Sequence, residues 1–490
     1  MFHLAAFQKI KSINRVDLNV IMNLLFLSVW VALYVAGLMH YSGSWLIYTE
    51  FSAVFLLMLI SGFYRQVSYG YLFLVVMLWL GFWLKLTTHM LFDYPFGEPI
   101  GYFNGTSERW DGVLWVATVG SIGVLLARFL YGFTGQSSIQ LIGNKFKAPA
   151  WYSTSRQWIW ALVISFCVIL ATANITMGIQ QSGLVPRTIM LWPLNALVYW
   201  LLNSGLSLAV ATLLWWDIAF RKNISFVVYF VLFEAFTSTV SILSRGIYLF
   251  HVVPQFLGLY KNRCLILAWS RRNVIAMTMA FFVLFAISNP LVNSLRGYYY
   301  SNVLPTWQFE GGQSSALLRF AVDRWIGAEG VMAVSAYPKK GDDLFLKALV
   351  ERGEIGKSTV YQEVCQSHYR FMDMKKFQFA SLPGAMGFLY FTGHAWVVLL
   401  GMVLLVLIVL VSEGLVSKFT SNPLISALWG GVAANAVAQM GIAPRGLLIY
   451  FFEQCCGIAF ICFIQSNLFS IILQKLHALI SGKRGLNDGR

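Results

Sequence analysis

Two arginines occupy matching positions in two separate parts of the chain. Arg245 lies in Ser241-Ile-Leu-Ser-Arg-Gly246 and Arg445 lies in Gly441-Ile-Ala-Pro-Arg-Gly446, each where one apolar segment ends and the next begins. A guanidinium group is always charged and can bind phosphate oxygens through two parallel hydrogen bonds. The glycine that follows each arginine lets the backbone approach a ligand closely. The pair predicts a site for a phosphate or pyrophosphate group, and the alternative is contact with lipid headgroups, which is common for Arg at helix ends.

A polar segment between these arginines supplies candidate acids and bases. Its sequence Asp323-Arg-Trp-Ile-Gly-Ala-Glu329 places two carboxylates, an arginine and a tryptophan within two helical turns. We expect Asp323 or Glu329 to act as a general base, with Arg324 and Trp325 binding the substrate. His368 is the only histidine of the segment and a second candidate for binding the substrate or taking its proton. For each residue the alternative is a solvated or structural role.

Two more basic residues are expected on the same side of the molecule. Lys85 lies in the outer third of an apolar segment, where a lysine is costly unless it faces a polar cavity. We therefore assign Lys85 to the substrate site, with extension of its chain to the lipid headgroups as the alternative. Arg187 belongs to a short connection on this side and is assigned to the same site. At the opposite side, Asp217 is expected to pair with Arg221.

The composition shows what must position these residues. Of 490 residues, 58% are hydrophobic and only 11% are charged, whereas soluble proteins carry about 25% charge. This excludes a soluble enzyme, a nucleic-acid binder and a secreted disulfide scaffold. Apolar runs of about 18 to 25 residues recur and predict an all-α membrane protein with about twelve spans. They cover 20–40, 45–64, 69–91, 113–133, 157–178, 193–217, 224–243, 246–260, 274–291, 386–412, 423–441 and 447–472.

The basic residues predict the orientation of the chain. Eighteen Lys and Arg residues fall in the segments on one side of the twelve spans, and four fall in the short segments on the other side. Because cytoplasmic segments carry the excess of Lys and Arg, we expect both termini to be cytoplasmic. Much of the net charge of +15 is then a matter of topology rather than of binding.

One connection on the outer side is far longer than the others. The sequence divides into residues 1–291 with nine spans, a large outer loop at 292–385, and residues 386–490 with three spans and a tail. The loop has helix signals at 314–336, at 342–352 with Asp342 as N-cap, and at 361–377, which predict a folded lid on the outer membrane surface. No metal-ligand or nucleotide-binding motif appears in the sequence, so we expect neither a metal nor a cofactor.

The layout of these features resembles the O-antigen or oligosaccharide repeat-unit polymerases (the Wzy type), including the enterobacterial common antigen polymerases. The resemblance covers about residues 225–470. It lies in Ser244-Arg245-Gly246, the 292–385 loop, Ser381-Leu-Pro-Gly-Ala-Met-Gly387 and Ala443-Pro-Arg-Gly446. The related O-antigen ligases carry a loop histidine in a fuller motif that Ser367-His-Tyr does not reproduce, which favours a polymerase over a ligase.

The resemblance implies a metal-independent membrane glycosyltransferase of the GT-C class in the bacterial inner membrane. Such an enzyme transfers a growing glycan from undecaprenyl pyrophosphate to an incoming lipid-linked repeat unit. Arg245 and Arg445 would hold the pyrophosphates, a loop carboxylate would take the acceptor proton, and Trp325 would stack on a sugar. The expected partners are the undecaprenyl-pyrophosphate-linked oligosaccharide, membrane lipids and a chain-length regulator protein, with no nucleic acid. An O-antigen ligase and a lipid-linked oligosaccharide flippase or transporter are the alternatives.

Overall fold

The computed structural model describes residues 2–64, 68–133, 148–262, 271–300, 322–441 and 444–480. Within these ranges the side chains of residues 2–19, 271, 300, 445 and 476–480 lie outside the description. The chain is 77% helical with almost no sheet. The prediction of an all-α multi-pass membrane protein is confirmed at this level, because many of the described helices combine length with an apolar surface.

Nine helices in the described ranges are long and apolar enough to cross a membrane. They are α1 (Phe2–His40), α2 (Trp45–Phe63), the continuous run of α3 (Tyr69–Trp79), the π-helix η1 (Leu80–Leu84) and α4 (Lys85–Phe92), α5 (Ser107–Gly132), α6 (Ala150–Met177), the run of α7 (Leu194–Trp200), the π-helix η2 (Leu201–Gly205) and α8 (Leu206–Ala219), α11 (Arg271–Tyr300), α17 (Ala395–Thr420) and α19 (Pro444–Gln465). Three shorter helices, α9 (Val228–Ile242), α10 (Arg245–Lys261) and α18 (Pro423–Ala438), occupy three further predicted spans. The count of twelve remains a prediction.

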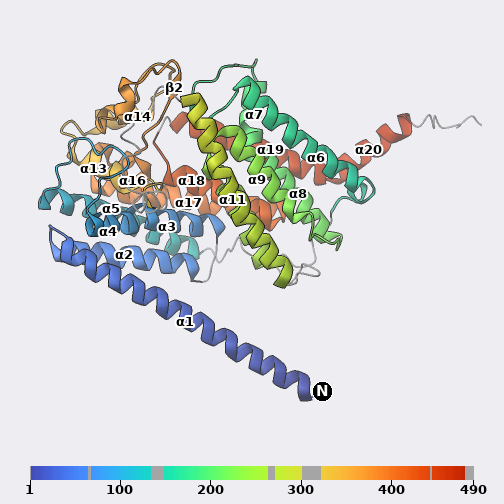
Figure 1. The fold of residues 1–490 in the computed structure, drawn as a ribbon, viewed down its shortest axis with the longest axis horizontal. Helices are drawn as coiled ribbons and strands as arrows, with labels where there is room; N and C mark the ends of the chain where they lie inside the picture. The colour runs from blue at the N-terminus through green and yellow to red at the C-terminus, as the bar shows by residue number, and fades with distance from the viewer. Residues whose placement is uncertain are drawn as a thin grey trace, which may run out of the picture.

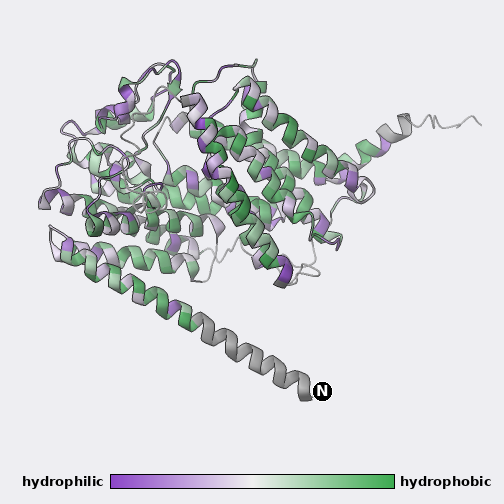
Figure 2. Cartoon of the chain, viewed as in Figure 1, coloured by the Kyte–Doolittle hydropathy of each residue, from purple (hydrophilic) through white to green (hydrophobic). Residues whose placement is uncertain are grey.

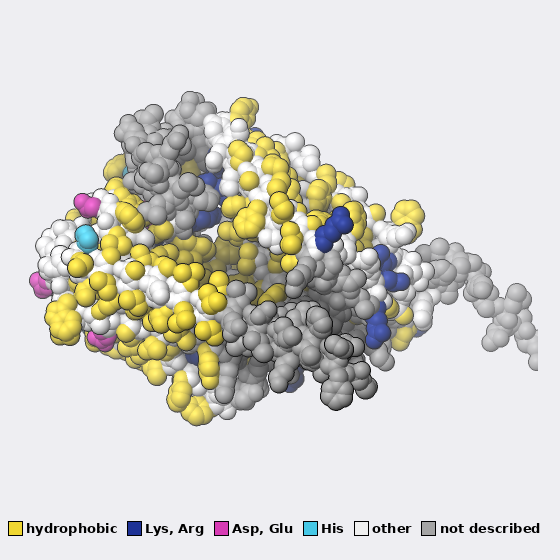
Figure 3. Space-filling view, turned by 60° about the horizontal axis from the view of Figure 1, so that its bottom comes forward, with side chains coloured by type: hydrophobic (Ala, Val, Ile, Leu, Met, Phe, Trp, Pro, Cys, Tyr) yellow, Lys and Arg dark blue, Asp and Glu magenta, His cyan; other side chains and the backbone are white. Residues whose placement is uncertain are grey.

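The helices pack around two hydrophobic cores. One core joins α2–α5 to α17 and to the C-terminal half of α18, and the other joins α6, α8, α9 and α10 to the N-terminal half of α18. Figure 1 shows these two groups side by side, with α1 extending away from both. The helices are largely apolar along their length (Figure 2), and one face of the molecule exposes mostly hydrophobic side chains with few charges (Figure 3). Such a face suits contact with lipid.

Two predicted span boundaries in the C-terminal part of the chain differ from the structure. The span expected at 386–412 begins only at Ala395, because residues 384–392 form the short helices α16 (Gly384–Leu389) and η6 (Tyr390–Thr392). Gly393 then turns the chain with a φ of +79°, a conformation that favours glycine. The span expected at 447–472 ends at Gln465, and α20 (Asn467–Ile480) follows as a separate helix. Hydropathy alone does not separate two apolar helices that are joined by a turn.

The segments predicted to face outward contact one another at one end of the molecule. Strand β1 (Gly183–Leu184) pairs with β2 (Phe377–Gln378), and the Gly101 amide donates to the Cys365 carbonyl at 3.1 Å. The Asp111 carboxylate accepts from the Tyr41 hydroxyl at 2.7 Å and from the Ser44 amide at 2.9 Å. We call this end the loop end. These contacts place the outer segments together, and which membrane face they occupy remains a prediction.

The large loop is not simply a lid over the surface. Its helix α13 (Ala328–Ala336) is buried in the first hydrophobic core against α5 and α16. The helices α14 (Asp342–Leu349) and α15 (Val360–Val364) pack against it in a smaller hydrophobic cluster, and the 3-10 helix η5 (His368–Phe371) contacts α15. Gly341 rather than Asp342 is the N-cap of α14, because the Gly341 carbonyl accepts the first helical hydrogen bond, from the Phe345 amide at 3.1 Å. Of the helix expected at 314–336, residues 314–321 lie outside the described residues.

Glycines allow α13 to enter the core. A methyl group at Gly327 would stand 2.7 Å from the Gly81 carbonyl oxygen, and one at Gly387 would stand 2.9 Å from the Gly330 carbonyl carbon. Gly81 belongs to η1, a π-helix, and such widened turns let a neighbouring chain approach the helix. Residues 326 and 327 therefore pack directly against the backbone of the third span, and Gly330 packs against Pro383 and Gly387. This contact brings the loop to the depth of Lys85.

Candidate functional site

Lys85 is the centre of a buried polar network. Its ammonium group forms an ion pair with Glu329 at 2.7 Å, donates to the Asp323 carbonyl at 3.1 Å, and donates to the Trp325 carbonyl. Lys85 has no exposed surface and Glu329 is 3% exposed. An ammonium group has three donors, and three protein oxygens use them. The structure brings the predicted Lys85 and Glu329 together, but it gives Lys85 partners within the protein rather than a ligand.

His89 extends the network by one helical turn. Its Nε2 lies 2.6 Å from Asp323 Oδ1 and its Nδ1 lies 2.9 Å from the Tyr94 carbonyl oxygen. The imidazole stacks on Phe96 with ring centroids 4.0 Å apart. We call Lys85, His89, Asp323 and Glu329 the Lys85 network. It holds the chain on both sides of Arg324, because Asp323 and Trp325 are both bound to it.

Arg324 is thereby directed toward the start of α10. A methyl group at Gly246 would stand 2.7 Å from Arg324 Nη2, so the guanidinium lies against the Arg245–Gly246 backbone. The charges of Arg324 and Arg296 both act on Arg245. The Arg324 side chain is partly exposed to solvent, but protein atoms surround much of its guanidinium group. The resulting loss of hydration and the nearby charge of Arg296 both lower the pKa of Arg324. We call Arg245, Arg296 and Arg324 the arginine cluster.

Arg296 binds the turn between α9 and α10, next to Arg245. Leu243 ends α9 in a left-handed conformation with a φ of +61°. The Leu243 carbonyl accepts hydrogen bonds from Arg296 Nε at 2.9 Å and from Arg296 Nη2 at 2.6 Å. These bonds use two of the five N–H donors of the guanidinium, so the others remain to face a ligand. Three positive groups that concentrate at one corner favour a bound anion such as a phosphate.

Three other residues predicted for the site are not part of the Lys85 network or the arginine cluster as the structure describes them. Arg445 lies in the first turn of α19, and its side chain is outside the described residues. Arg187 donates to the Ile175 carbonyl at 3.1 Å and lies over the Tyr299 ring at 5.1 Å, where it joins α6 to α11. Trp325 packs partly buried against the first hydrophobic core.

The structure also places His368 and shows the partner of Asp217. His368 lies in η5 with its ring centroid 4.2 Å from that of Tyr369, and burial lowers the pKa of its imidazole. Asp217 was expected beside Arg221, but it forms two bonds with Arg156, at 2.6 and 2.8 Å. The prediction of its partner is wrong because α8 faces α6, and the turn at residue 221 directs Arg221 away, with a φ of +52°.

A carboxyl group that the sequence did not single out lies next to the Lys85 network. Burial and the neighbouring charge of Glu329 raise the pKa of Glu98 to about 7, while Ser381 and Lys85 act in the opposite direction. Glu98 Oε2 is buried and has no hydrogen-bond partner among the described residues. Glu98 is therefore a weak acid that can gain or lose a proton near neutral pH. It follows Gly97 in a loop, and no helical or strand pattern marks it in the sequence.

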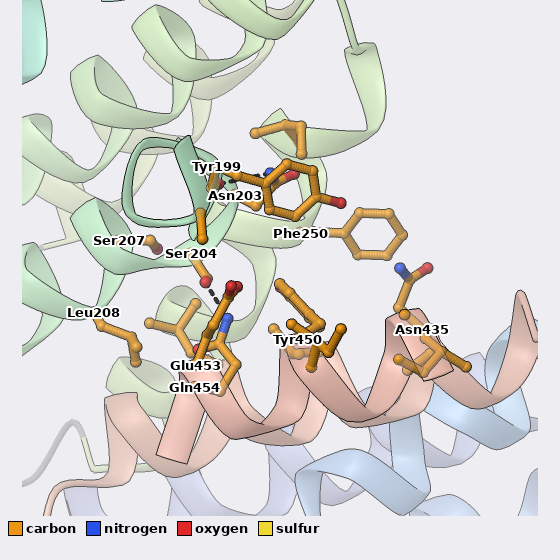
Figure 4. A pocket seen from close by; sticks show the side chains of 18 of the residues that line it. Tyr199, Asn203, Ser204, Ser207, Leu208, Phe250, Asn435, Tyr450, Glu453 and Gln454 are labelled. Carbon is orange, nitrogen blue, oxygen red and sulfur yellow. Dashed lines mark hydrogen bonds between the residues drawn. The ribbon is translucent and has the colours of Figure 1, made fainter. Parts of the chain in front are cut away.

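A cavity of about 760 Å³ lies beside the arginine cluster; its surface is mainly apolar but carries several polar side chains, and we call it the polar cavity. It is formed by the N-terminal halves of α10 and α19, by α18 from Leu428 onward, and by α7 and η2. Figure 4 shows Asn203, Tyr450, Glu453 and Asn435 around a shared space. Ile247 and Phe250 of α10 also line it, within about one helical turn (about 5.4 Å of axis) of Gly246. The cavity and the arginine cluster are therefore adjacent parts of one region.

The polar wall of the cavity depends on the π-helix η2. His251 lies 2.8 Å from the Asn203 carbonyl through Nε2 and 3.0 Å from Glu234 Oε1 through Nδ1. Ser204 accepts a hydrogen bond from Gln454 across the cavity. A π-helix shifts the hydrogen-bond pattern of the backbone, which makes carbonyl groups available to side chains. Sequence analysis missed this wall, since its Asn, Ser and Gln residues are scattered over four apolar segments.

A recurring dipeptide could have revealed Arg296. Arg296 is followed by Gly297, as Arg245 is followed by Gly246, but it stands in the segment assigned to the loop. The structure continues α11 to Tyr300, about nine residues or roughly 13 Å past the predicted end at 291. That extension carries Arg296 to the corner at Leu243. A search for every Arg–Gly pair near a span end would have found it.

Comparisons with known proteins found no relative of this chain. No protein-family model, no curated protein and no solved structure matched the chain. Within the described residues, no group of three or more His, Cys, Asp and Glu side chains is arranged to hold a metal ion. The chemistry of the arginine cluster and the polar cavity therefore carries the functional argument. The chain is a mostly helical, multi-pass membrane protein, and the geometry at its loop end is the basis for its function.

Proposed function

We propose that the protein polymerises undecaprenyl-pyrophosphate-linked oligosaccharide repeat units into a surface polysaccharide on the outer face of the bacterial inner membrane. The observation that carries this proposal is the arginine cluster. Arg245, Arg296 and Arg324 come from three separate segments and meet at the end of a polar cavity. A cluster of guanidinium groups at a membrane surface suits a pyrophosphate headgroup, because each can bind two oxygens at once.

The arrangement suggests how the reaction would be catalysed. The pyrophosphate leaves the donor sugar with additional negative charge, and preorganised positive groups stabilise that charge in the transition state. The Lys85 network would hold Arg324 in position for this role, because its bonds to residues 323, 325 and 329 fix the surrounding chain. Asp323 and Glu329 then serve as positioning residues, since their carboxylates already face His89 and Lys85.

Substitution of Arg324 tests the proposal directly. In a deletion strain that carries the variant gene, Arg324→Ala should abolish long polymer and leave a single repeat unit attached to the cell surface. Removal of one transition-state donor lowers a rate about 100- to 1,000-fold. Arg352→Ala is the control, because Arg352 is an exposed arginine in the same loop. Electrophoresis of the surface glycan gives the readout, and long polymer from Arg324→Ala expressed at normal levels would show that the proposal is wrong.

The same strains separate the two alternative functions. Deletion of a ligase gene removes all attached glycan, and deletion of a flippase gene leaves the lipid-linked unit on the cytoplasmic side. The polar cavity is the observation that favours a transporter, since transporters bind substrates in such cavities within the membrane. A single attached repeat unit in the deletion strain would exclude both alternatives.

A further inference from the structure

The polar cavity has the chemistry of a site for uncharged sugars. Carboxamides line it from three sides, with Asn195 on α7, Asn435 on α18 and Gln454 on α19. Aromatic rings line the same walls, including Tyr199 on α7 and Tyr450 on α19. Carboxamides both donate and accept hydrogen bonds, as sugar hydroxyls do, and aromatic rings stack on the apolar faces of sugars. No Lys or Arg is among the described residues that line it.

Two of the lining side chains have unused hydrogen-bonding capacity. Asn195 Oδ1 and Asn435 Oδ1 are buried and have no hydrogen-bond partner among the described residues. An unsatisfied buried amide oxygen is costly, and this cost is larger at membrane depth, where no lipid group can compensate. A ligand with several hydroxyl groups would satisfy both oxygens. A polyprenyl chain would satisfy neither, which argues against the cavity as a site for the lipid tail.

Glu453 is the carboxylate of this cavity that a ligand can reach. Figure 4 shows it in the cavity wall beside Gln454, in the N-terminal half of α19. Glu234 does not line the cavity, and its carboxylate contacts His251 and Ser238. Glu453 has no hydrogen bond or ion pair to any described residue, and its charge acts on Tyr199 and Tyr450, which face the same space. A partly exposed carboxylate among carboxamides is suited to accept a proton from a hydroxyl group.

We propose that the polar cavity binds the neutral saccharide of the acceptor and that the Glu453 carboxylate accepts the proton of its reacting hydroxyl group. This inference rests on the proposed function, in which the arginine cluster binds the pyrophosphate of the donor. The acceptor oxygen forms a bond to the anomeric carbon of the donor sugar. The bond from that carbon to the pyrophosphate oxygen breaks, its electron pair leaves with the pyrophosphate, and the hydroxyl proton passes to Glu453.

The volume and position of the cavity agree with this assignment. Its 760 Å³ lies within the range of about 300–1,000 Å³ that is usual for small-molecule sites. Phe250 lines the cavity and would lie 3.4 Å from a methyl group at Gly246, the residue that contacts Arg324. A sugar in the cavity and a pyrophosphate at the arginine cluster would therefore be neighbours. Reaction between two substrates requires this proximity.

Photolabelling of the purified full chain in nanodiscs tests the binding site. The probe is dodecyl maltoside with a photoreactive group on its sugar, and mass spectrometry identifies the labelled peptides. We expect labelling of residues 435–454 that excess dodecyl maltoside suppresses about tenfold, as simple competition predicts. Dodecyl phosphocholine, which has the same tail and no sugar, should leave the labelling unchanged. Equal competition by both detergents would mean that the cavity binds the tail, and the proposal would then be wrong.

Variants of the cavity provide matched controls. Asn435→Leu should reduce specific labelling by about tenfold, because the buried amide is lost. Cys455→Ser should label like the wild type, since Cys455 is exposed on the other side of α19 and does not line the cavity. Gln439→Leu, at a second carboxamide of the same wall, tests the same idea if Asn435→Leu does not fold. Unchanged labelling in a folded variant would contradict the site.

Glu453→Gln separates proton transfer from binding. This variant should be labelled like the wild type, yet it should yield only single repeat units in the deletion strain, while Glu453→Asp should restore some polymer. Long polymer from Glu453→Gln would refute the role of the carboxylate. If Arg324→Ala still makes polymer, the proposed function fails while the labelling result stands. If labelling is absent but Arg324→Ala stops polymerisation, only the inference about the cavity fails.

Discussion

Substitution of Lys85 by methionine tests the physical account of the Lys85 network. The change removes a buried ammonium group and leaves the Glu329 carboxylate, 3% exposed, without its counter-ion. Breaking a buried ion pair costs about 3–5 kcal/mol. The Asp323 and Trp325 carbonyls lose a donor at the same time, and each buried unpaired acceptor adds about 1–3 kcal/mol. We therefore expect Lys85→Met to lower the free energy of unfolding by at least about 5 kcal/mol.

The double variant Lys85→Met/Glu329→Met divides this loss into two parts. It removes the stranded charge, so it should recover about 3 kcal/mol or more, while the two carbonyls remain without a donor. The control is Lys347→Met, which breaks an exposed pair with Glu363 at 3.7 Å and should cost less than about 1 kcal/mol. Unfolding by SDS in mixed micelles measures these three variants and the single variant Glu329→Met. The reasoning is refuted if Lys85→Met behaves like Lys347→Met, or if the losses of the two single variants simply add.

Two further predictions concern other buried carboxyl groups. Because burial and Glu329 raise the pKa of Glu98 to about 7, the folded protein keeps this proton at a pH where the unfolded chain, with a value of 4.5, has lost it. Glu98 therefore favours the folded state most below pH 4.5 and loses this contribution as the pH rises to about 7. Glu98→Gln should accordingly raise the thermal midpoint of unfolding at about pH 8 and not at about pH 4. Equal effects at both pH values would contradict the assignment. The Glu413 carboxylate caps α3 by accepting hydrogen bonds from Ser68 Oγ at 2.6 Å and from two backbone amides at 2.6 and 2.8 Å. Glu413→Gln should therefore lower the free energy of unfolding by about 2–4 kcal/mol in the same SDS assay. The control Glu354→Gln, at an exposed ion pair, should leave it almost unchanged.

The amino-acid sequence determined the class of the molecule and its periodic elements. Runs of about 20 apolar residues can be stable only across a membrane or in a large core, and this local property is visible without a structure. The sequence also indicated Arg245, because an arginine between two apolar segments is unusual on composition alone. Lys85 was marked for the same reason, since a lysine at membrane depth requires a polar partner. Local composition could not supply the identity of that partner.

Only the tertiary structure decided which distant residues meet. Glu329 lies 244 residues from Lys85 along the chain, and the cavity gathers side chains from residue 189 to residue 454. Close approach of Gly81, Gly327 and Gly330 buries α13, a segment whose charged neighbours made it look like a surface lid. Single Asn, Ser and Gln residues in apolar helices carry no periodic signal, so their convergence depends on helix packing and on the turn of the backbone at η2. Sequence periodicity is a local property, whereas a binding site is a set of non-local contacts.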